Sequence, residues 1–483
     1  METKRLQLEN TYITLPEKLY SKVNPTKIIH PELVVWNENL AEQLVLSEEN
    51  WTTEDKANIF SGNEIPIGAT PIAQAYAGHQ FGHFTMLGDG RAHLLGELID
   101  IHGNRLDIQL KGSGITPYSR RGDGRATLKS MLREYLISEA MHGLGIPTSR
   151  SLAVVKSAEK IWREKQETMA VLTRVASSHL RIGTFEFAKR FAGLDALEAL
   201  TKYALNRHYP NLPDHQFIGL TLLEAVMEKQ LDLVVNWWRV GFIHGVMNTD
   251  NTGIAGETFD YGPCAFMNAY HPETVYSSID HGGRYAFENQ PGIIQWNLSV
   301  LAGALLPLID DEQEKAIEKA QRLLQSFPQL FEIKWRRMMC EKIGIIYKDE
   351  NDQLLIKELL NWMQENKADF TNTFAYLTYG EIYETPLFLK DNFQEIKQKL
   401  AKRRQKESNA AELANKMKCL NPCFIPRNHL VEKALAQMAS GNDDFWNTWI
   451  GALKDPYNIN NFNSSIVQPP DDGDYGYQTF CGT

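Results

Sequence analysis

One stretch, residues 244–262, constrains this 483-residue chain more than any other. It reads HGVMNTDNTGIAGETFDYG, with Asp250 directly before Asn251 and with Asp260 opening an Asp-Tyr-Gly triplet. In phosphoryl-transfer enzymes that carry the loop H-R-D-L-x-x-x-N followed by D-F-G, the Asn and the second Asp hold magnesium. His244, Asn251 and Asp260 match the His, the Asn and that second Asp. The stretch therefore predicts a metal-binding loop that serves chemistry on a phosphate group.

The proton acceptor of that motif is missing from its usual position. Val246 stands there, and its side chain cannot take a proton. Asp250 is the one carboxylate between the His and the Asn of the loop. Two interpretations stay open at this point: the base has moved to Asp250, or it has been lost.

The segments before this loop follow the order of a protein-kinase N-lobe. Alternating and turn-forming residues predict a β-hairpin with strands at 93–100 and 105–111. Apolar residues at helical spacing predict a helix over 126–144, ended by glycine and proline. A second hairpin is expected at 151–156 and 169–175. A glycine loop, a hairpin, a helix and another hairpin make up such a lobe.

A lysine–glutamate pair is expected within this segment. In kinases a strand lysine holds the α- and β-phosphates and is oriented by a glutamate on the following helix. Lys111 ends the second predicted strand, and the helix after it offers Glu134 and Glu139. Both carboxylates remain candidates, although Glu134 is favoured because it lies next to the apolar stripe of the helix.

A short repeat marks a possible phosphate site. Gly-Asp-Gly-Arg-Ala occurs at 88–92 and again at 122–126. Glycines let backbone N–H groups approach an anion closely, and an arginine can then pair with it. The repeat predicts two phosphate-binding turns that flank the first hairpin; the alternative is two unrelated turns of common residues. No G-x-x-x-x-G-K-[ST] motif occurs, which disfavours a P-loop NTPase.

Arg174 and Arg181 follow at the end of a predicted strand. Two guanidinium groups can grip a terminal phosphate bidentately. If they bury the γ-phosphate, the nucleotide enters reversed relative to a kinase, and its α-phosphate faces the acceptor.

Charge and composition exclude several classes of protein. The net charge is −10, which argues against a dedicated nucleic-acid binder. No long uncharged apolar run predicts a membrane span. The N-terminus resembles neither a signal peptide nor a transit peptide, so we expect the chain in the cytoplasm. Five cysteines are too few, and odd in number, for a disulfide framework, and the lack of a second Cys or His pair near Cys419 and Cys423 argues against a zinc site.

The predicted fold is α+β: a protein-kinase-like bilobal core with an N-terminal extension and a helical C-terminal extension. The expected divisions are an extension (1–65), an N-lobe (66–182), a C-lobe core with the catalytic loop (183–310), a helical region (311–456) and an extended tail (457–483).

Many ungapped blocks resemble the selenoprotein O family. They include AGHQFG, LGDGRAHLLGE, QLKGSGITPYSRRGDGRA, REYLISEAM, GIPTSRSL, RVASSHLRIGTFE, HGVMNTDN, DYGPCAFM and NQPGIIQWNL. The resemblance implies a pseudokinase fold that binds ATP reversed with Mg²⁺ or Mn²⁺ and transfers AMP to hydroxyl side chains of proteins. It implies Asp250 as the base and Asn251 and Asp260 as metal ligands. The nucleotide would contact the residues Gly88, Gly90, Arg91, Lys111, Asp123, Gly124, Glu134, Arg174, Arg181 and Asp260.

The same resemblance concerns two cysteines. Cys481 stands third from the end, where eukaryotic members carry selenocysteine, and Cys264 lies just after the Asp-Tyr-Gly triplet. A regulatory disulfide between them is therefore a hypothesis, against the alternative of a buried small hydrophobe and an incidental tail thiol. Two other functions also remain open: γ-phosphoryl transfer with Asp250 as a relocated base, and an inactive nucleotide-binding scaffold.

Overall fold

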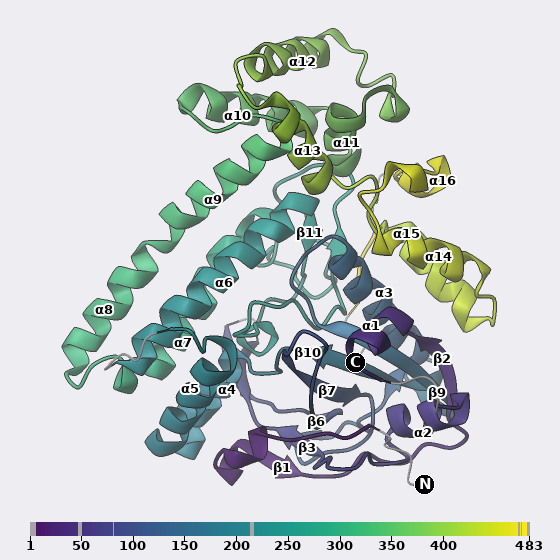
Figure 1. The fold of residues 1–483 in the computed structure, drawn as a ribbon, viewed down its shortest axis with the longest axis vertical. Coiled ribbons are helices and arrows are strands. Elements are labelled where there is room, and N and C mark those ends of the chain that lie inside the picture. The colour runs from purple at the N-terminus through teal and green to yellow at the C-terminus, as the bar shows by residue number, and fades with distance from the viewer. Residues whose placement is uncertain are drawn as a thin grey trace.

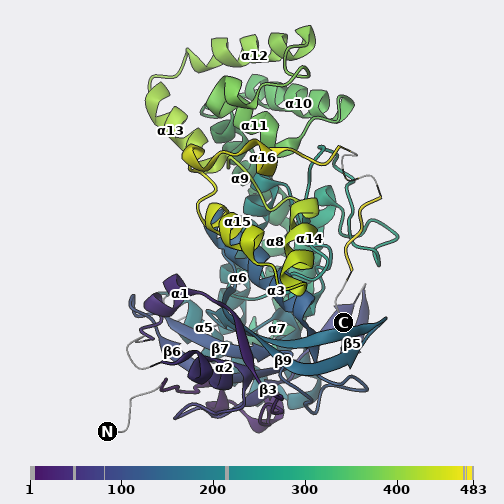
Figure 2. The ribbon, with the colours of Figure 1, turned by 90° about the vertical axis from the view of Figure 1, so that its right-hand side faces the viewer.

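The protein has a sheet-rich half and a helical half. The structure is a computed structural model that describes residues 6–46, 51–80, 82–212, 217–471, 474 and 476–480. The N-terminal sheet lies at one end of the molecule, and the helices of the C-terminal half stand over it (Figures 1 and 2). The predicted α+β class and the helical C-terminal region are confirmed.

The main sheet has eight strands in the order β1-β3-β6-β7-β10-β9-β2, with β8 paired to β10. The strands are β1 (Tyr20–Lys22), β2 (Glu32–Trp36), β3 (Ile72–Gln74), β6 (Ala92–Ile99), β7 (Arg105–Lys111), β8 (Ala126–Thr127), β9 (Arg150–Trp162) and β10 (Gln166–Ala176). Both predicted hairpins are present as β6–β7 and β9–β10, each antiparallel. β1 and β2 form the two edges of the sheet, and both lie in the segment 1–65, for which the sequence predicted only an extension.

Alternation along the strands divides their side chains between two hydrophobic clusters. Leu94 and Leu172 join the cluster that contains helix α3 (Leu128–Gly143). Their chain neighbours Leu95 and Val171 join the cluster beneath α1 (Glu38–Gln43) and α2 (Thr53–Ser61). Because successive strand residues point to opposite faces, the sheet is buried on both sides. On β7 the apolar side chains face α2, so its polar side chains face the helical half.

Helix α3 begins later than the sequence predicts. The expected helix over 126–144 starts at Leu128, because Ala126 and Thr127 pair with β10 as β8. The Thr127 hydroxyl accepts a hydrogen bond from the Ser130 N–H at 3.2 Å and caps the helix. This start sets which α3 side chains face the sheet.

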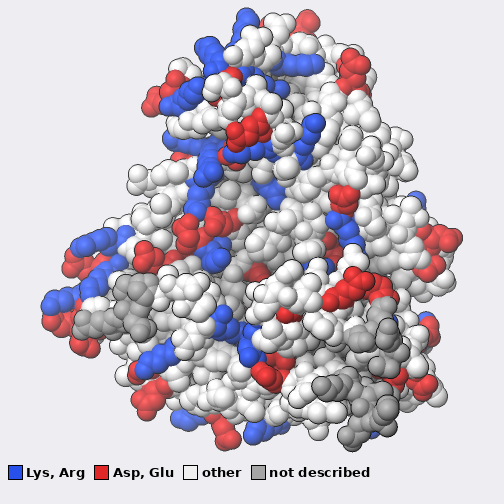
Figure 3. All heavy atoms as spheres, in the orientation of Figure 1, with Lys and Arg blue, Asp and Glu red and all other residues white. Residues whose placement is uncertain are grey.

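The helical half comprises the remaining long elements. They are α4 (Ile182–Phe187), α5 (Leu194–His208), α6 (Ile218–Val240), α7 (Gln290–Leu305), α8 (Gln313–Gln325), α9 (Phe327–Lys342), α10 (Glu350–Glu365), α11 (Phe370–Tyr379), α12 (Asp391–Arg404), α13 (Ala410–Leu420), α14 (Asn428–Ala439), α15 (Asp444–Lys454) and α16 (Ser464–Val467). Two small hairpins, β4 (Ala77–Gln80) with β5 (His83–Met86) and β11 (Phe242–Ile243) with β12 (Ala265–Phe266), lie outside the main sheet. Acidic and basic side chains are interspersed over the face shown in Figure 3.

The segment Phe287–Leu308 is long and apolar enough to cross a membrane by length and composition, with a mean hydropathy of 1.3. It contains α7, which packs against α4, α6 and α9. Leu298, Leu301 and Leu305 are buried in the large cluster. In this structure the apolar character of α7 belongs to the core of the helical half.

Asp107, on the polar face of β7, ties α5 to the sheet. Its carboxylate lies 2.6 Å from Arg207 Nη2 on α5 and accepts a 2.9 Å hydrogen bond from the His179 backbone N–H. Burial by itself raises the pKa of Asp107, but Arg207 and His179 outweigh it, and the net pKa is lowered. The carboxylate therefore stabilises the fold in its ionised form.

We expect Asp107→Asn to lower the free energy of unfolding at pH 7 by about 1.5–3 kcal/mol, because Arg207 would lose its 2.6 Å contact to a buried carboxylate and keep Glu97 at 3.2 Å. A carboxyl whose pKa is lowered in the folded protein stabilises the fold fully above its unfolded pKa of about 3.9. This stabilisation is lost as the pH falls toward and through the pKa of the folded state. Urea unfolding should therefore show that the difference in free energy of unfolding between wild type and variant is smaller at pH 3 than at pH 7. Glu318→Gln, which removes an exposed pair with Arg322, is the control and should change little. An equal difference at both pH values would contradict the conclusion that Asp107 stabilises the fold in its ionised form.

Candidate nucleotide site

Four charged side chains from four parts of the chain meet between the sheet and the helical half. Lys111 Nζ lies 2.6 Å from Glu134 Oε2 and 2.5 Å from Asp260 Oδ1. Arg174 Nη2 lies 2.7 Å from the same Asp260 oxygen, and Arg174 also binds Glu134. Lys111, Glu134 and Arg174 are each at most 7% exposed. The cluster therefore holds its charges away from water, where they act strongly on one another.

The local structure explains why these residues converge. Lys111 is on the polar face of β7, opposite Leu172 of β10 in the register, and Arg174 follows two residues along β10 on the same face. Glu134 comes from α3, which packs on β9 and β10. Glu139, the alternative partner for Lys111, instead binds Arg150 through two 2.8 Å hydrogen bonds. The structure thus selects Glu134.

Asp260 is held in an unusual backbone conformation. Its φ is +65°, in the left-handed region that non-glycine residues rarely adopt. Burial alone raises the pKa of Asp260, but Arg174, Lys111 and Arg181 together hold it well below its usual range. The carboxylate is therefore ionised and directed at three cations, in a strained conformation typical of functional sites.

Arg181, the residue before α4, joins this cluster to the loop at 244–262. Its Nη1 donates a 3.0 Å hydrogen bond to the Asp250 carbonyl and lies 3.8 Å from Asp260 Oδ2. Its guanidinium lies over the rings of Tyr76 and Phe259, at 4.3 and 4.9 Å. Such stacking fixes the plane of the guanidinium. Tyr76 was not predicted as part of the site, and no motif in the sequence marks it.

Asp250 lies in a short 3₁₀ turn, Thr249–Asn251, and is 7% exposed. Its Oδ1 has no hydrogen-bond partner among the residues that the structure describes. Burial raises its pKa to about 6, although Arg181 acts in the opposite direction. A buried carboxylate with an unoccupied oxygen and a pKa near neutrality has the properties of a general base.

Asn251 and Asp260 are the two residues that the sequence predicts to hold a divalent cation. The Asn251 amide donates through Nδ2 to the Val246 carbonyl at 3.1 Å, which leaves its Oδ1 as an oxygen ligand. Asp260 supplies a carboxylate oxygen, Oδ2, which lies 3.8 Å from Arg181 Nη1, beyond hydrogen-bond distance. Within the described residues no group of three or more His, Cys, Asp or Glu side chains could hold a metal ion. A donor set of one amide and one carboxylate fits Mg²⁺, which takes few protein ligands and completes its shell with water and substrate phosphates.

The first glycine turn lies beside this cluster. Gly88 has a φ of +118°, and a Cβ there would lie 2.4 Å from the Tyr118 ring. Asp89 between the glycines is buried and accepts a 3.1 Å hydrogen bond from the Gln74 N–H. The Gly90 carbonyl accepts a hydrogen bond from Ser119. Arg91 is close enough to Lys111 to lower the pKa of that lysine, after the larger effects of burial and Arg174.

The second copy of the pentapeptide is built differently. Asp123 is half-exposed and binds Arg163 through two 2.9 Å hydrogen bonds. Gly124 has a φ of +66° and accepts a 3.0 Å hydrogen bond from the Gly114 N–H. Among the described residues, Asp123 and Gly124 make no hydrogen bond or ion pair with the Lys111 cluster. Their role in nucleotide binding therefore stays a prediction.

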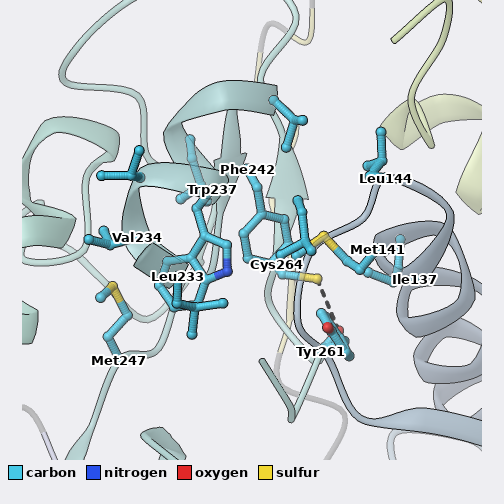
Figure 4. Close-up of a cluster of buried hydrophobic side chains, with 14 of the residues drawn as sticks. Ile137, Met141, Leu144, Leu233, Val234, Trp237, Phe242, Met247, Tyr261 and Cys264 are labelled. Atoms are coloured by element: carbon cyan, nitrogen blue, oxygen red, sulfur yellow. Dashed lines mark hydrogen bonds between the residues drawn. The ribbon is translucent and has the colours of Figure 1, made fainter. Parts of the chain in front are cut away.

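Cys264 lies in the core rather than on the surface of the site. Figure 4 shows its side chain among Met141, Trp237 and Phe242, with its thiol directed at the Tyr261 carbonyl at 3.4 Å. Burial raises the pKa of the Cys264 thiol to about 12, so it resists forming a reactive thiolate.

The C-terminal tail nevertheless runs close to Cys264. The Thr479 hydroxyl donates a 2.5 Å hydrogen bond to the Pro263 carbonyl. Cys481 itself lies outside the described residues. The Cys264–Cys481 disulfide stays a prediction, which peptide mapping of oxidised protein under non-reducing conditions would test.

Strand β4 covers Asp250 closely, and Gly78 makes this possible. A Cβ at residue 78 would lie 2.3 Å from Asp250 Oδ1. We expect Gly78→Ala to displace that carboxylate and to abolish catalysis while ATP affinity, measured by calorimetry, is retained. Gly292→Ala in α7 is the matched control, because a Cβ there would meet no atom within 4 Å. Full activity in Gly78→Ala would show that the position of Asp250 is unimportant.

Comparison with known proteins identifies the family of the chain. A family model described as "Protein adenylyltransferase SelO" matches residues 2–449. The protein nucleotidyltransferase YdiU of Geobacillus kaustophilus is 52% identical over 479 residues, which cover 99% of each chain. The protein of the same name from Pelagibacter ubique is 49% identical over 476 residues, 98% of this chain and 99% of its own. The chain therefore belongs to the SelO family and is an enzyme of the nucleotidyltransferase class.

Proposed function

We propose that the enzyme transfers AMP from ATP to Ser, Thr or Tyr hydroxyls of proteins. The observation that carries this proposal is Asp250, a buried carboxylate with an unoccupied oxygen and a pKa raised to about 6. The Asp250 backbone is connected through Arg181 to a cluster of buried cations suited to a polyphosphate. A base next to a phosphate site is the arrangement that hydroxyl attack on phosphorus requires.

The cations of the cluster would hold the phosphate chain. Lys111 and Arg174 already bind carboxylates at 2.5–2.7 Å, and phosphate oxygens can replace part of these contacts. In the proposed pose Arg174 and Arg181 bind the γ-phosphate, and the nucleotide is reversed relative to a kinase. Glu134 stays behind Lys111 and keeps its ammonium group oriented. The α-phosphate then lies nearest to Asp250.

Transfer proceeds by attack of the acceptor oxygen on the α-phosphorus. Asp250 accepts the hydroxyl proton as the new O–P bond forms. The bond from the α-phosphorus to the bridging oxygen breaks, and pyrophosphate leaves with that oxygen. Mg²⁺ or Mn²⁺ on Asn251 and Asp260, when bound, would neutralise charge on the phosphates. Lys111, Arg174 and Arg181 supply the remaining positive charge for the leaving pyrophosphate.

We further propose that the sheet half and the helical half correspond to the two lobes of a kinase-like fold. The β6–β7 hairpin, the Lys111–Glu134 pair across α3, and the loop at Thr249–Asn251 that precedes Asp260 support this interpretation. The proposed setting is the cytoplasm, with protein acceptors as partners and without nucleic acid or membrane.

ATP labelled separately at the α- and γ-phosphates tests the reaction. We expect α-label on protein and none from the γ-position. Protein-bound γ-label would favour a kinase with a relocated base, and neither label would favour a nucleotide-binding scaffold. The relatives are named as nucleotidyltransferases, which favours the α-label. Competition by unlabelled GTP, CTP and UTP in the same assay would establish which base the site prefers.

A further inference from the structure

A group of aromatic and basic side chains extends from Asp250 to the protein surface. We define the acceptor patch as His79, Phe84, Arg190, Phe191, Arg284 and Trp296. The patch begins at the proposed base: the His79 backbone N–H donates a 2.9 Å hydrogen bond to the hydroxyl of Thr249, the residue before Asp250. Gly78 precedes His79, and a side chain at residue 78 would clash with the Asp250 carboxylate. The charged cluster of Lys111, Glu134, Arg174 and Asp260 includes none of these six side chains.

The rings of the patch are in continuous contact. The His79 ring lies 5.5 Å from that of Phe84 and 5.4 Å from that of Trp296, both edge to face. The Phe84 ring lies 6.3 Å from that of Phe191, which is 44% exposed. These distances are typical of favourable aromatic pairs. A partly exposed aromatic surface thus leads directly to the catalytic loop.

Glu186 and a π-helix hold the patch in place. The buried Glu186 carboxylate lies 2.6 Å from His79 Nδ1, on the side of the patch next to the core. The chain then forms a π-helix at Ala188–Ala192, which carries Arg190 and Phe191. π-helical turns are rare and are frequent at functional sites. An irregular helix that presents an exposed aromatic ring and an arginine beside a catalytic base is expected of a binding surface.

The two arginines of the patch stack on its aromatic rings. The Arg190 guanidinium lies over the Phe84 ring at 4.1 Å, and that of Arg284 lies over the Trp296 ring at 4.9 Å. In the part of the chain that the structure describes, neither arginine makes an ion pair with Asp or Glu, although the chain as a whole is acidic. Arginine and aromatic residues are enriched where proteins bind one another.

From this continuity and charge we infer that the patch binds the acceptor protein through an acidic segment that carries the modified hydroxyl. Aromatic faces of Phe84, Phe191 and Trp296 would contact apolar parts of that segment, while Arg190 and Arg284 pair with its carboxylates. The hydroxyl residue then lies next to His79, above Asp250. This inference rests on the proposed function, because it names the acceptor of the same reaction.

Two synthetic peptides and α-labelled ATP test the inference on the full chain. The peptides differ only in the residues around one tyrosine, which are Glu in one and Lys in the other. We expect the wild-type chain to label the Glu-flanked peptide with a kcat/KM about tenfold higher or more, as complementary charge favours encounter and suppresses wrong partners. Arg190→Glu should reverse this preference through KM, with the affinity for ATP unchanged. Phe191→Ala should raise KM for both peptides.

Arg337→Glu on α9 is the matched control, because Arg337 is an exposed arginine remote from the site that pairs with Glu341. Thermal melting should show that the exposed substitutions leave the fold intact. Equal labelling of the two peptides by the wild type, or equal effects of Arg190→Glu and Arg337→Glu, would overturn the inference. Labelling of neither peptide, while α-label still reaches whole proteins, would overturn it as well. Absence of α-label on any protein would instead count against the proposed function.

Discussion

Asp250→Asn is expected to lower the rate of AMP transfer by about 10²–10⁴-fold, the range that a general base contributes. ATP affinity should remain, since among the described residues the contact of Asp250 with the cation cluster is through its backbone carbonyl. The substitution preserves the shape of the buried side chain and removes its basicity. Single-turnover transfer of α-label, together with calorimetry of ATP binding, measures the two quantities separately.

Asp260→Asn should behave differently, because Asp260 balances Lys111, Arg174 and Arg181 and is the proposed carboxylate ligand of the metal. Both metal-dependent ATP binding and transfer should be lost. A buried cluster that loses one negative charge also leaves its cations less compensated, so the stability of the apo-protein should fall. Equal loss of ATP affinity in the two variants would refute the division into base and ligand. Retained transfer in Asp250→Asn would refute the base itself.

Several parts of this site could be predicted from local sequence. The alternation of β7 and the helical spacing of α3 place Lys111 and Glu134 toward one another, and the structure joins them at 2.6 Å. The α+β class follows from the same patterns. These features depend on short-range periodicity, which a single sequence records directly.

Other parts depend on long-range neighbours. β1 and β2 are short strands without clear alternation. They form because β3 and β9, distant in the sequence, pair with them. The two identical pentapeptides differ for the same reason: Asp89 is buried beside Gln74, whereas Asp123 meets Arg163 on the surface. The pairing of Arg174 with both Glu134 and Asp260 requires the register of β10 against β7. Local sequence contains none of these relations.

In the proposed pose, Arg174 and Arg181 bind the γ-phosphate and so set the polarity of the nucleotide. Arg174→Ala or Arg181→Ala should weaken ATP by about 10–100-fold, since a charge-assisted contact contributes about 1.5–3 kcal/mol and each 1.4 kcal/mol is tenfold in affinity. AMP, which lacks the γ-phosphate, should bind nearly as before. The measured quantity is the ratio of ATP to AMP affinity by calorimetry at constant Mg²⁺.

The ratio matters because removal of Arg174 also leaves Glu134 and Asp260 less compensated and can destabilise the site as a whole. Arg150→Ala is the matched control, because it leaves Glu139 on the same helix without its bidentate partner at a distance from the phosphates. That variant should lose stability to a similar degree and keep the ATP-to-AMP ratio of the wild type. If Arg174→Ala and Arg181→Ala weaken ATP and AMP equally, the arginines do not bind the γ-phosphate. The α-phosphate would then no longer be placed at Asp250, and γ-phosphoryl transfer would become the better account of the site.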